Sequence, residues 1–291
     1  MSILVLGRSG QLATALAEVA SSSTPLRLAG RPELDMAEEG SAAALIEATS
    51  PSLVINTATR TAVDQAEAEP AAAHRINAEA VGEAAAAAHS VGASFVHVST
   101  DYVFDGSAGA PWTEDRPVAP LNSYGRSKLA GEEALRRANP DHLILRTSWL
   151  YGATGQNFVL TMLRLAQSRP EVRVVDDQRG CPTEVGDLAR ALLALAQRRL
   201  GGDRAGWGET YHLAGSEACS WAEFAQALFA EAGSLGWPAA RVVPIPSADY
   251  PTPARRPLYS VLDCSKAERQ FGLTLPGFRE AVPKLLRRLQ G

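Results

Sequence analysis

The chain has 291 residues, of which 46% are hydrophobic, which is enough to bury one large α/β unit or two domains. Its net charge is -4 and its basic residues are scattered, so we expect neither a nucleic-acid nor a membrane partner. A start without a basic segment and the lack of any apolar run of roughly 20 residues predict a cytoplasmic protein. Three widely spaced cysteines predict reduced thiols and neither a disulfide nor a zinc site.

The first predicted elements are a buried strand over residues 3–6 and a helix that begins near Gln11. The turn between them follows the pattern G-x-x-G-x-x-A, from Gly7 to Ala13. Its glycines permit a tight turn and close approach of a pyrophosphate, and the helix N-terminus favours the anion. A purely structural turn is the alternative. We predict a dinucleotide site made by Gly7, Ser9, Gly10, Gln11 and Leu12.

A second strand over residues 26–29 ends at Gly30 and Arg31, where an NAD-preferring enzyme usually carries an acid for the ribose hydroxyls. The acid is absent, so Arg31 is a candidate to bind the 2′-phosphate of NADP, with a solvated loop arginine as an equal alternative. Asp35 and Met36 follow. They either pack around the adenine or cap an alanine-rich helix expected over residues 38–48.

A third strand over residues 53–56 precedes a small polar segment at its carboxyl end. We predict that Ala58, Thr59 and Arg60 line the dinucleotide there. A helix over residues 70–90 begins with a proline, which suits a first helical position. Asn77 inside this helix is either a polar core contact or a residue that holds backbone near the site.

The fourth strand leads to Thr100 and precedes a helix that carries Tyr124 and Lys128 on one face. An ammonium beside a phenol lowers the phenol's pKa toward the range in which it can exchange a proton. Any amphipathic helix can carry such a pair by chance. Together with the nucleotide turn, however, the pair predicts a catalytic site formed by Thr100, Tyr124 and Lys128.

A fifth strand over residues 142–146 completes an alternation of strands and helices that predicts an α/β fold, a doubly wound parallel sheet of the Rossmann type. We expect this nucleotide-binding domain over residues 1–150, with a return near 183–215. A smaller, interleaved C-terminal substrate domain is expected over 151–182 and 216–291. Five prolines over residues 244–257 exclude helix and central strand. Arg255 and Arg256 in that segment either pair with a diphosphate or are solvated.

Several strings of residues together resemble the extended short-chain dehydrogenase/reductases, and within them the dTDP-4-dehydrorhamnose reductase family. They are Gly7-Arg-Ser-Gly-Gln-Leu12, the stretch from Asn56 to Glu67, Ser99-Thr-Asp-Tyr-Val-Phe104, Tyr124-Gly-Arg-Ser-Lys128, Arg146-Thr-Ser-Trp-Leu-Tyr151, Gly155-Gln-Asn-Phe158 and Asp177-Gln-Arg-Gly-Cys-Pro-Thr183.

The resemblance implies that Thr100, Tyr124 and Lys128 are catalytic. It also implies that Thr100, Asp101 and Trp149 touch the sugar nucleotide and that Arg256 lies in the substrate domain. Ala13 departs from the glycine often found at its position. Some relatives dimerise through a glutamate-bound magnesium ion, but Ala15 offers no ligand on the first helix, so we expect no metal.

The activity that the resemblance implies is reduction of the C4 ketone of dTDP-4-dehydro-β-L-rhamnose to dTDP-L-rhamnose, with NADPH as the hydride donor and NADH possible. Tyr124 would give the proton, Lys128 would hold the nicotinamide ribose and lower the Tyr124 pKa, and Thr100 would stabilise the developing alkoxide. Two alternatives share these motifs: a nucleotide-sugar epimerase and a non-catalytic regulatory subunit of the methionine adenosyltransferase type. We expect a monomer or a homodimer.

Overall fold

The core of the molecule is a sheet of six parallel strands, seen in a computed structural model that describes residues 2–20 and 25–290. The strand order is β10-β5-β4-β3-β1-β2. The strands are β1 (Ile3–Leu6), β2 (Leu26–Ala29), β3 (Leu53–Asn56), β4 (Ser94–Thr100), β5 (His142–Thr147) and β10 (Glu209–His212). The predicted doubly wound parallel sheet is therefore confirmed, including the late return of the chain through β10.

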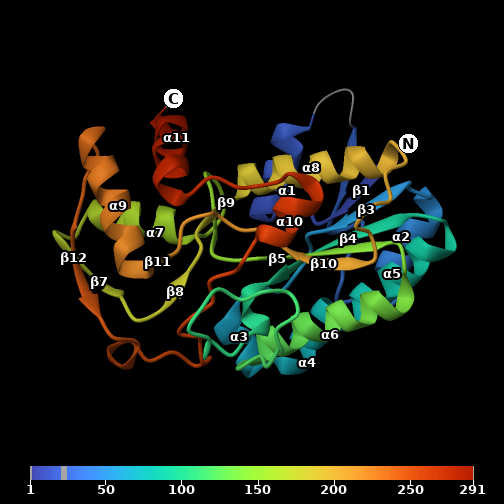
Figure 1. Cartoon of the computed structure of the whole chain (residues 1–291), viewed down its shortest axis with the longest axis horizontal. Helices are drawn as coiled ribbons and strands as arrows, with labels where there is room; N and C mark the ends of the chain where they lie inside the picture. The colour runs from blue at the N-terminus through green and yellow to red at the C-terminus, as the bar shows by residue number, and fades with distance from the viewer. Residues whose placement is uncertain (1, 21–24, 291) are drawn as a thin grey trace.

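Helices cover both faces of this sheet, which explains why its strands are apolar on both sides (Figure 1). On one face lie α1 (Gln11–Val19) and α8 (Val185–Leu200). On the other face lie α2 (Ser41–Thr49), α5 (Ala80–Ser90) and α6 (Ser123–Ala138). Each face buries its own hydrophobic cluster, so the sheet is fixed between two packed layers.

The strand order reverses between β1 and β3. The chain leaves β1 to form β2 on one side and then crosses to β3 on the other side. Loops after β1 and β3 therefore diverge at the carboxyl edge of the sheet, which is where open α/β sheets bind ligands. The predicted nucleotide turn and the segment from Ala58 to Arg60 both lie at this edge.

The helix predicted over residues 70–90 is interrupted. It consists of α4 (Pro70–His74), a π-helical turn η1 (Arg75–Glu79) and α5 (Ala80–Ser90), and a short helix α3 (Val63–Ala68) precedes it. A π turn inserts one extra residue into a helix, and such turns occur frequently at functional sites. Here the inserted turn contains Asn77. The helix expected over residues 38–48 begins only at Ser41, because Gly40 adopts a left-handed conformation before it.

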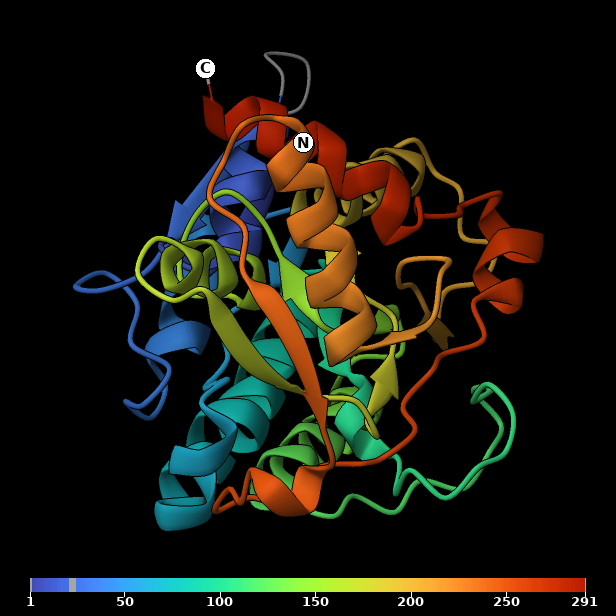
Figure 2. The same cartoon turned by 90° about the vertical axis from the view of Figure 1, so that its left-hand side faces the viewer.

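A smaller unit lies beside the sheet, formed by α7 (Phe158–Ala166), α9 (Trp221–Ser234) and α11 (Phe278–Gln290) around the parallel pair β7 (Glu171–Val175) and β12 (Arg241–Ile245) (Figure 2). Phe224 and Phe278 meet edge to face in its core. The sequence did not predict β12, which contains Pro244. Proline is tolerated in such a strand because one side of a two-stranded pair needs no ladder hydrogen bonds.

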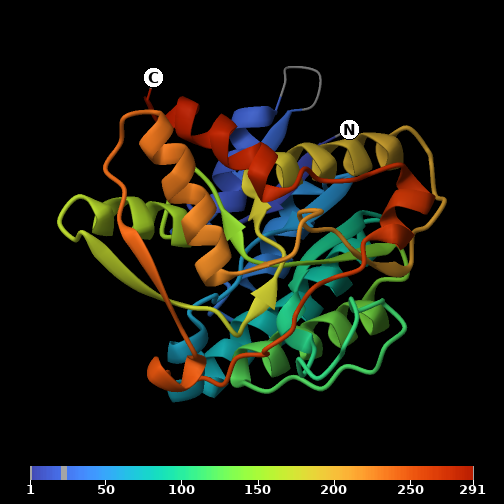
Figure 3. The same cartoon turned by 60° about the vertical axis from the view of Figure 1, so that its left-hand side comes forward.

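Short strand pairs connect the smaller unit to the site. β6 (Leu150–Tyr151) pairs with β9 (Thr183–Glu184), and β8 (Arg179–Gly180) pairs with β11 (Cys219–Ser220). After β12 and the turn η3 (Ser247–Asp249), the chain runs back to α10 (Ser265–Phe271) beside the main sheet (Figure 3). Ala267 and Phe271 of α10 share the hydrophobic cluster of Tyr211. This segment therefore packs on the main sheet, although the sequence assigned it to the substrate domain.

Two features are absent from the residues that the structure describes. No helix among them is long and apolar enough to cross a membrane. In the same residues, no group of three or more His, Cys, Asp or Glu side chains is arranged to hold a metal ion. The three cysteines are free thiols.

Candidate active site

The predicted nucleotide turn packs closely against the loop after β3. Gly7 adopts a φ of 117°, and a Cβ atom there would lie 2.5 Å from Oγ1 of Thr57, so only glycine fits. Gly10 is the N-cap residue of α1 and has no side chain that could accept a hydrogen bond from the amides of the first turn. Those amides therefore remain available to an anion. Leu12 is buried in the core beneath the turn, so its side chain supports the turn from inside.

Gln11 connects this turn to the smaller unit. Its Oε1 accepts a hydrogen bond of 3.0 Å from Nδ2 of Asn157, the residue that caps α7. Its Nε2 donates to the carbonyl of Gln156 at 3.3 Å. The loop before α7 is thus held against the start of α1, beside Ser9, which is exposed.

Two arginines lie near the end of β2, Arg31 in the loop after β2 and Arg8 in the turn after β1. Arg31 forms two hydrogen bonds to the Asp35 carboxylate, at 2.6 and 3.1 Å, and its side chain is 73% exposed. Arg8 packs beside Gly30 and contacts Glu33 at 3.3 Å. The Arg31 guanidinium lowers the pKa of Asp35. The sequence analysis overlooked Arg8, although it lies inside the predicted turn.

Met36 is 6% exposed and packs in the cluster that covers one face of the sheet. The sequence left adenine contact or helix capping open for Asp35 and Met36. Because the Met36 side chain is buried, any contact that it makes with the adenine comes from within the core. Asp35 accepts a hydrogen bond from the amide of Ala37 at 2.9 Å and stabilises the turn before α2.

Asn77 holds the loop after β3. Its Oδ1 accepts hydrogen bonds from Oγ1 of Thr59 at 2.9 Å and from the Arg60 amide at 2.8 Å, and its Nδ2 donates to Oγ of Ser127 at 3.0 Å. Of the two alternatives left by the sequence, Asn77 is a backbone-holding residue. Arg60 itself pairs with Glu69 at 2.8 Å. The π turn thereby ties the segment that includes Ala58 to α6.

Thr100 stands at the carboxyl end of β4 and begins the turn η2 (Asp101–Val103). Its hydroxyl donates to Oδ1 of Asp101 at 3.1 Å and accepts from the Tyr102 amide at 3.2 Å. The Thr100 hydroxyl also lies close enough to Tyr124 to lower the pKa of that phenol in part. Asp101 is 2% exposed, and burial raises its pKa to about 6.

The first turn of α6 brings Tyr124 to Thr100. Asn122 caps the helix by accepting a hydrogen bond from the Gly125 amide at 2.8 Å. A Cβ atom at position 125 would lie 2.3 Å from the Tyr102 carbonyl oxygen, so glycine permits the close approach of α6 to η2. The Tyr102 and Tyr124 rings meet edge to face at 5.6 Å.

Lys128 lies one helical turn after Tyr124 and is 1% exposed. Its Nζ donates to the Val98 carbonyl at 2.7 Å and lies 3.1 Å from Nε2 of His97. Burial lowers the pKa of Lys128 to about 7. Burial also raises the pKa of Tyr124 to about 12, with the Thr100 hydrogen bond lowering it in part. The expected depression of the Tyr124 pKa by Lys128 is therefore wrong for this structure, in which Nζ binds β4.

A buried ionic network fixes α6 against β4 and β5. Glu132, with no exposed surface, accepts hydrogen bonds from Ser99 at 2.6 Å, from Arg146 at 2.8 and 2.7 Å, and from Arg136 at 2.9 Å. Burial alone would raise the Glu132 pKa, but these donors lower it. The sequence analysis assigned these residues no role. The signal for Glu132 was its position one turn after Lys128.

Trp149 lies between β5 and β6, where the chain leaves the main sheet. It has a φ of 48°, uncommon for a bulky residue, and its ring stacks on Trp221 at 3.5 Å with an interplanar angle of 3°. Phe158 packs on Trp221 at 4.7 Å. One face of the Trp149 indole is therefore covered by Trp221, a residue that the sequence analysis did not single out.

Arg256 is bound to the nucleotide-binding domain. Its guanidinium donates to both carboxylate oxygens of Asp64, at 3.1 and 2.8 Å, and to the Ala254 carbonyl at 2.9 Å. Its side chain is 22% exposed. Binding of a substrate diphosphate by Arg256 stays a prediction, and this ion pair would have to open or be shared.

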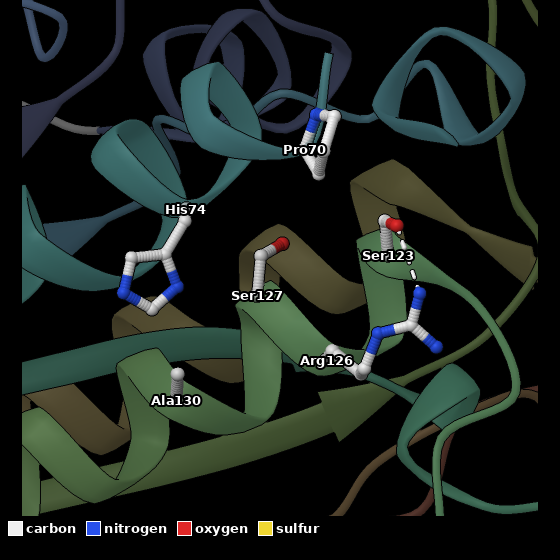
Figure 4. A pocket seen from close by; sticks show the side chains of 6 residues that line it. All are labelled: Pro70, His74, Ser123, Arg126, Ser127 and Ala130. Carbon is white, nitrogen blue, oxygen red and sulfur yellow. Dashed lines mark hydrogen bonds between the residues drawn. The ribbon is translucent and has the colours of Figure 1, made fainter. Parts of the chain in front are cut away.

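A separate pocket of about 350 Å³ lies between α4 and α6 (Figure 4). It is lined by Pro70, His74, Ser123, Arg126, Ser127 and Ala130. At 100° per residue, its α6 residues lie on a different face of the helix from Tyr124 and Lys128. This pocket is therefore distinct from the predicted active site.

Comparisons with known proteins show the family of this chain. A family described as "RmlD substrate binding domain" matches residues 1–290. A dTDP-4-dehydrorhamnose reductase from Sinorhizobium fredii is 43% identical over 98% of this chain and 97% of its own length.

Two solved structures titled dTDP-4-dehydrorhamnose reductase superpose closely. The protein from Clostridium acetobutylicum gives a TM-score of 0.92 at 36% identity, covering 100% of both chains. The protein from Bacillus anthracis, solved in complex with NADP, gives 0.91 at 34% identity over 99% of both chains. This chain belongs to the dTDP-4-dehydrorhamnose reductase family of extended short-chain dehydrogenase/reductases.

Proposed function

We propose that this protein reduces the C4 ketone of dTDP-4-dehydro-β-L-rhamnose to dTDP-L-rhamnose with NADPH. The family and its NADP-bound structural relative support the reaction class and the cofactor. The single observation that carries the proposal is the joint burial of Thr100, Tyr124 and Lys128 where β4 meets α6.

The residues present fit a dinucleotide. The tight Gly7 turn and the uncapped N-terminus of α1 suit its pyrophosphate, and Ala58 and Thr59 follow β3 where the strand order reverses. NADPH, when bound, supplies the hydride that the reduction needs. Arg31 after β2 and Arg8 after β1 are the proposed contacts of its 2′-phosphate, and the absence of an acid at Gly30 leaves NADH as a weaker alternative.

Tyr124 is the proposed proton donor. A phenol with a pKa near 12 is fully protonated at neutral pH, so it holds the proton that the developing alkoxide takes. Thr100 lies beside Tyr124, and its hydroxyl, which donates to Asp101 in this structure, would turn to donate to the same oxygen and stabilise its charge in the transition state. Lys128, one turn along the helix, is the proposed contact of the nicotinamide ribose.

Asp101 and Trp149 are the proposed sugar-nucleotide contacts. Asp101 lies buried beside Thr100, and Trp149 is partly exposed, with its ring stacked on Trp221 and packed against Gly180. Arg256 is the third proposed contact, competing with Asp64. A cytoplasmic location, a monomeric or homodimeric state and the domain boundaries given by the sequence also remain proposals.

The function is tested by following NADPH oxidation with a panel of nucleotide-linked 4-ketosugars. We expect the highest kcat/KM with the 4-keto-6-deoxyhexose of L-configuration linked to dTDP. Tyr124→Phe, which keeps the ring packing and loses the proton, is the matched control. Binding of NADPH with no consumption on any sugar would favour a regulatory subunit. Interconversion of sugars without net oxidation would favour an epimerase.

A further inference from the structure

Trp149 adopts a backbone conformation that a bulky side chain rarely tolerates. Its φ of 48° lies in the left-handed region, where large residues are outliers. Among the described residues other than glycine, only Ser50 shares a positive φ, and Ser50 caps the end of α2, where such a conformation is usual. Trp149 joins two strands instead. A conformation of this kind persists only where neighbouring groups fix it, and such positions cluster at sites that hold ligands.

The backbone around Trp149 is tied to one short segment of the chain. The Ser148 hydroxyl donates a hydrogen bond to the Cys181 carbonyl at 2.7 Å. The Thr183 amide donates to the Trp149 carbonyl at 3.2 Å. Directly afterwards, β6 pairs with β9. The Trp149 backbone therefore cannot change conformation without moving this segment as well.

Two residues fix the ring of Trp149. The Trp221 ring lies parallel to it, with a centroid distance of 3.5 Å and an interplanar angle of 3°. A Cβ atom at Gly180 would lie 2.4 Å from Cε2 and 2.5 Å from Nε1 of the Trp149 indole. The indole thus rests directly against the backbone of Gly180, and any larger residue there would displace it.

Gly180 and Trp221 are held together as one structural element. The antiparallel pair β8 and β11 places Arg179 opposite Ser220, so Gly180 and Trp221 each lie next to a paired residue. Trp221 is the first residue of α9, and Ser220 and Glu223 form the capping box of this helix. The Glu223 carboxylate also pairs with Arg179 at 3.2 Å. The spacing between the two residues that contact the indole is therefore fixed.

Trp149 also lies close to the proposed catalytic residues in the fold. The register of β4 and β5 places Thr147 opposite Thr100, and Trp149 follows Thr147 by two residues. The Trp149 side chain is partly exposed. An accessible ring with a fixed orientation therefore stands near the edge of the sheet where the ketone would react.

We propose that Gly180 and Trp221 are positioning residues that hold the Trp149 indole in one orientation for the sugar nucleotide. This inference rests on the proposed function, which supplies the substrate class. A ring that is fixed before the substrate binds loses no side-chain freedom on binding, so the two residues contribute affinity without touching the reacting atoms. Because Trp149 supplies neither a proton nor a hydride, their loss should raise KM and leave kcat nearly unchanged.

Trp221→Leu and Gly180→Ala disturb the two sides of the indole separately. Leucine keeps an apolar side chain but removes the stacked ring, and alanine adds one carbon where the indole lies. We expect each variant to raise the Kd for dTDP-L-rhamnose, measured by calorimetry with NADP⁺ present, and the KM of the ketosugar by about three- to tenfold. Trp221→Phe keeps a ring that can stack, so its loss of affinity should be smaller.

Trp237→Leu and Gly109→Ala are the matched controls. Trp237 packs against the same hydrophobic cluster as Trp221. A Cβ atom at Gly109 would meet nothing within 4 Å. We expect neither control to change the affinity for dTDP-L-rhamnose, and we expect the NADPH affinity of all these variants to stay within about twofold of the wild type.

The ring itself can be observed by ¹⁹F NMR. The chain contains five tryptophans, so protein labelled with 5-fluorotryptophan gives five signals, each assigned by replacing one tryptophan with phenylalanine. A stacked indole shifts the signal of its neighbour through its ring current. Trp221→Leu should therefore move the Trp149 signal more than those of the other remaining tryptophans, and dTDP-L-rhamnose should move the Trp149 signal in the wild type.

A folded Trp221→Leu or Gly180→Ala protein with wild-type affinity for dTDP-L-rhamnose would overturn the proposal. An unmoved Trp149 signal in Trp221→Leu would do the same, and so would an equal loss of affinity in Trp237→Leu. Failure of the proposed function looks different, because the wild type itself would then neither bind dTDP-L-rhamnose nor oxidise NADPH with the ketosugar. That outcome would overturn both proposals together.

Discussion

Replacing Arg146 by leucine should destabilise the protein strongly without touching the reacting groups. Arg146 has a side chain 4% exposed and supplies two of the hydrogen bonds to the fully buried Glu132. The variant leaves the Glu132 carboxylate in the core with Ser99 and Arg136 as its remaining partners. Because Ser99 precedes Thr100 and Glu132 follows Lys128 by one turn, this network sets the distance between the catalytic strand and helix.

The expected magnitude follows from the burial. Breaking a buried ion pair by removing one partner costs about 3–5 kcal/mol. Arg136 is 37% exposed and remains hydrogen-bonded, so the lower end, about 3 kcal/mol, is expected. For a chain of this size that corresponds to a fall in Tm of roughly 6–12 °C. Glu132→Leu combined with Arg146→Leu should recover much of the loss, because no unpaired charge is left.

Unfolding in urea and by heat measures these differences, with the double variant closing a thermodynamic cycle. The Glu132 pKa is lowered in the folded state, so its stabilisation is present above the unfolded pKa of about 4.3 and is lost as pH falls through the lower folded value. The difference in unfolding free energy between wild type and Arg146→Leu should therefore become smaller below about pH 4. A difference in unfolding free energy under ~1 kcal/mol between wild type and Arg146→Leu at pH 7 would refute the reasoning. So would a double variant whose loss of stability equals the sum of the losses in the two single variants.

Three other variants test individual site residues. Tyr124→Phe should abolish turnover while NADPH affinity, measured by fluorescence titration, changes only ~2–3-fold, since only a proton donor is lost; a variant that keeps most of the wild-type rate is incompatible with the assignment. Arg31→Ala should lower the NADPH-to-NADH ratio of kcat/KM by about tenfold. If this ratio is unchanged in Arg31→Ala but falls in Arg8→Ala, the 2′-phosphate contact belongs to Arg8. Arg256→Ala should raise the KM for the sugar nucleotide, whereas Asp64→Ala should not. If both variants lose the same amount of stability and neither changes the KM, Arg256 and Asp64 form only an interdomain ion pair.

Much of the nucleotide-binding half could be predicted from sequence because its signals are local. A strand, a glycine turn and a helix follow one another within residues 3–19, and each depends on neighbours in the chain. The parallel sheet could be predicted for the same reason, because its strands are short apolar runs that are buried on both faces. The pair Tyr124 and Lys128 was visible because 3.6-residue periodicity places them on one helix face.

What the sequence did not predict depends on contacts between distant segments. The direction of the Tyr124 pKa shift was wrong because burial outweighs any effect of Lys128, whose Nζ binds β4. The ion pair of Arg256 with Asp64 joins residues that are 192 positions apart, and no local pattern in the sequence predicts it. The stacking of Trp149 on Trp221 likewise requires the fold of the smaller unit.

Deuteride transfer tests the central claim most directly. The purified protein is incubated with NADPH deuterated at the transferable C4 position and with dTDP-4-dehydro-β-L-rhamnose, and the sugar product is examined by mass spectrometry and NMR. The account predicts dTDP-L-rhamnose carrying one deuterium at C4 for each NADPH oxidised, and no label when Tyr124→Phe replaces the wild type. Bound NADPH that stays unoxidised with this sugar, or a sugar product without deuterium at C4, would contradict it.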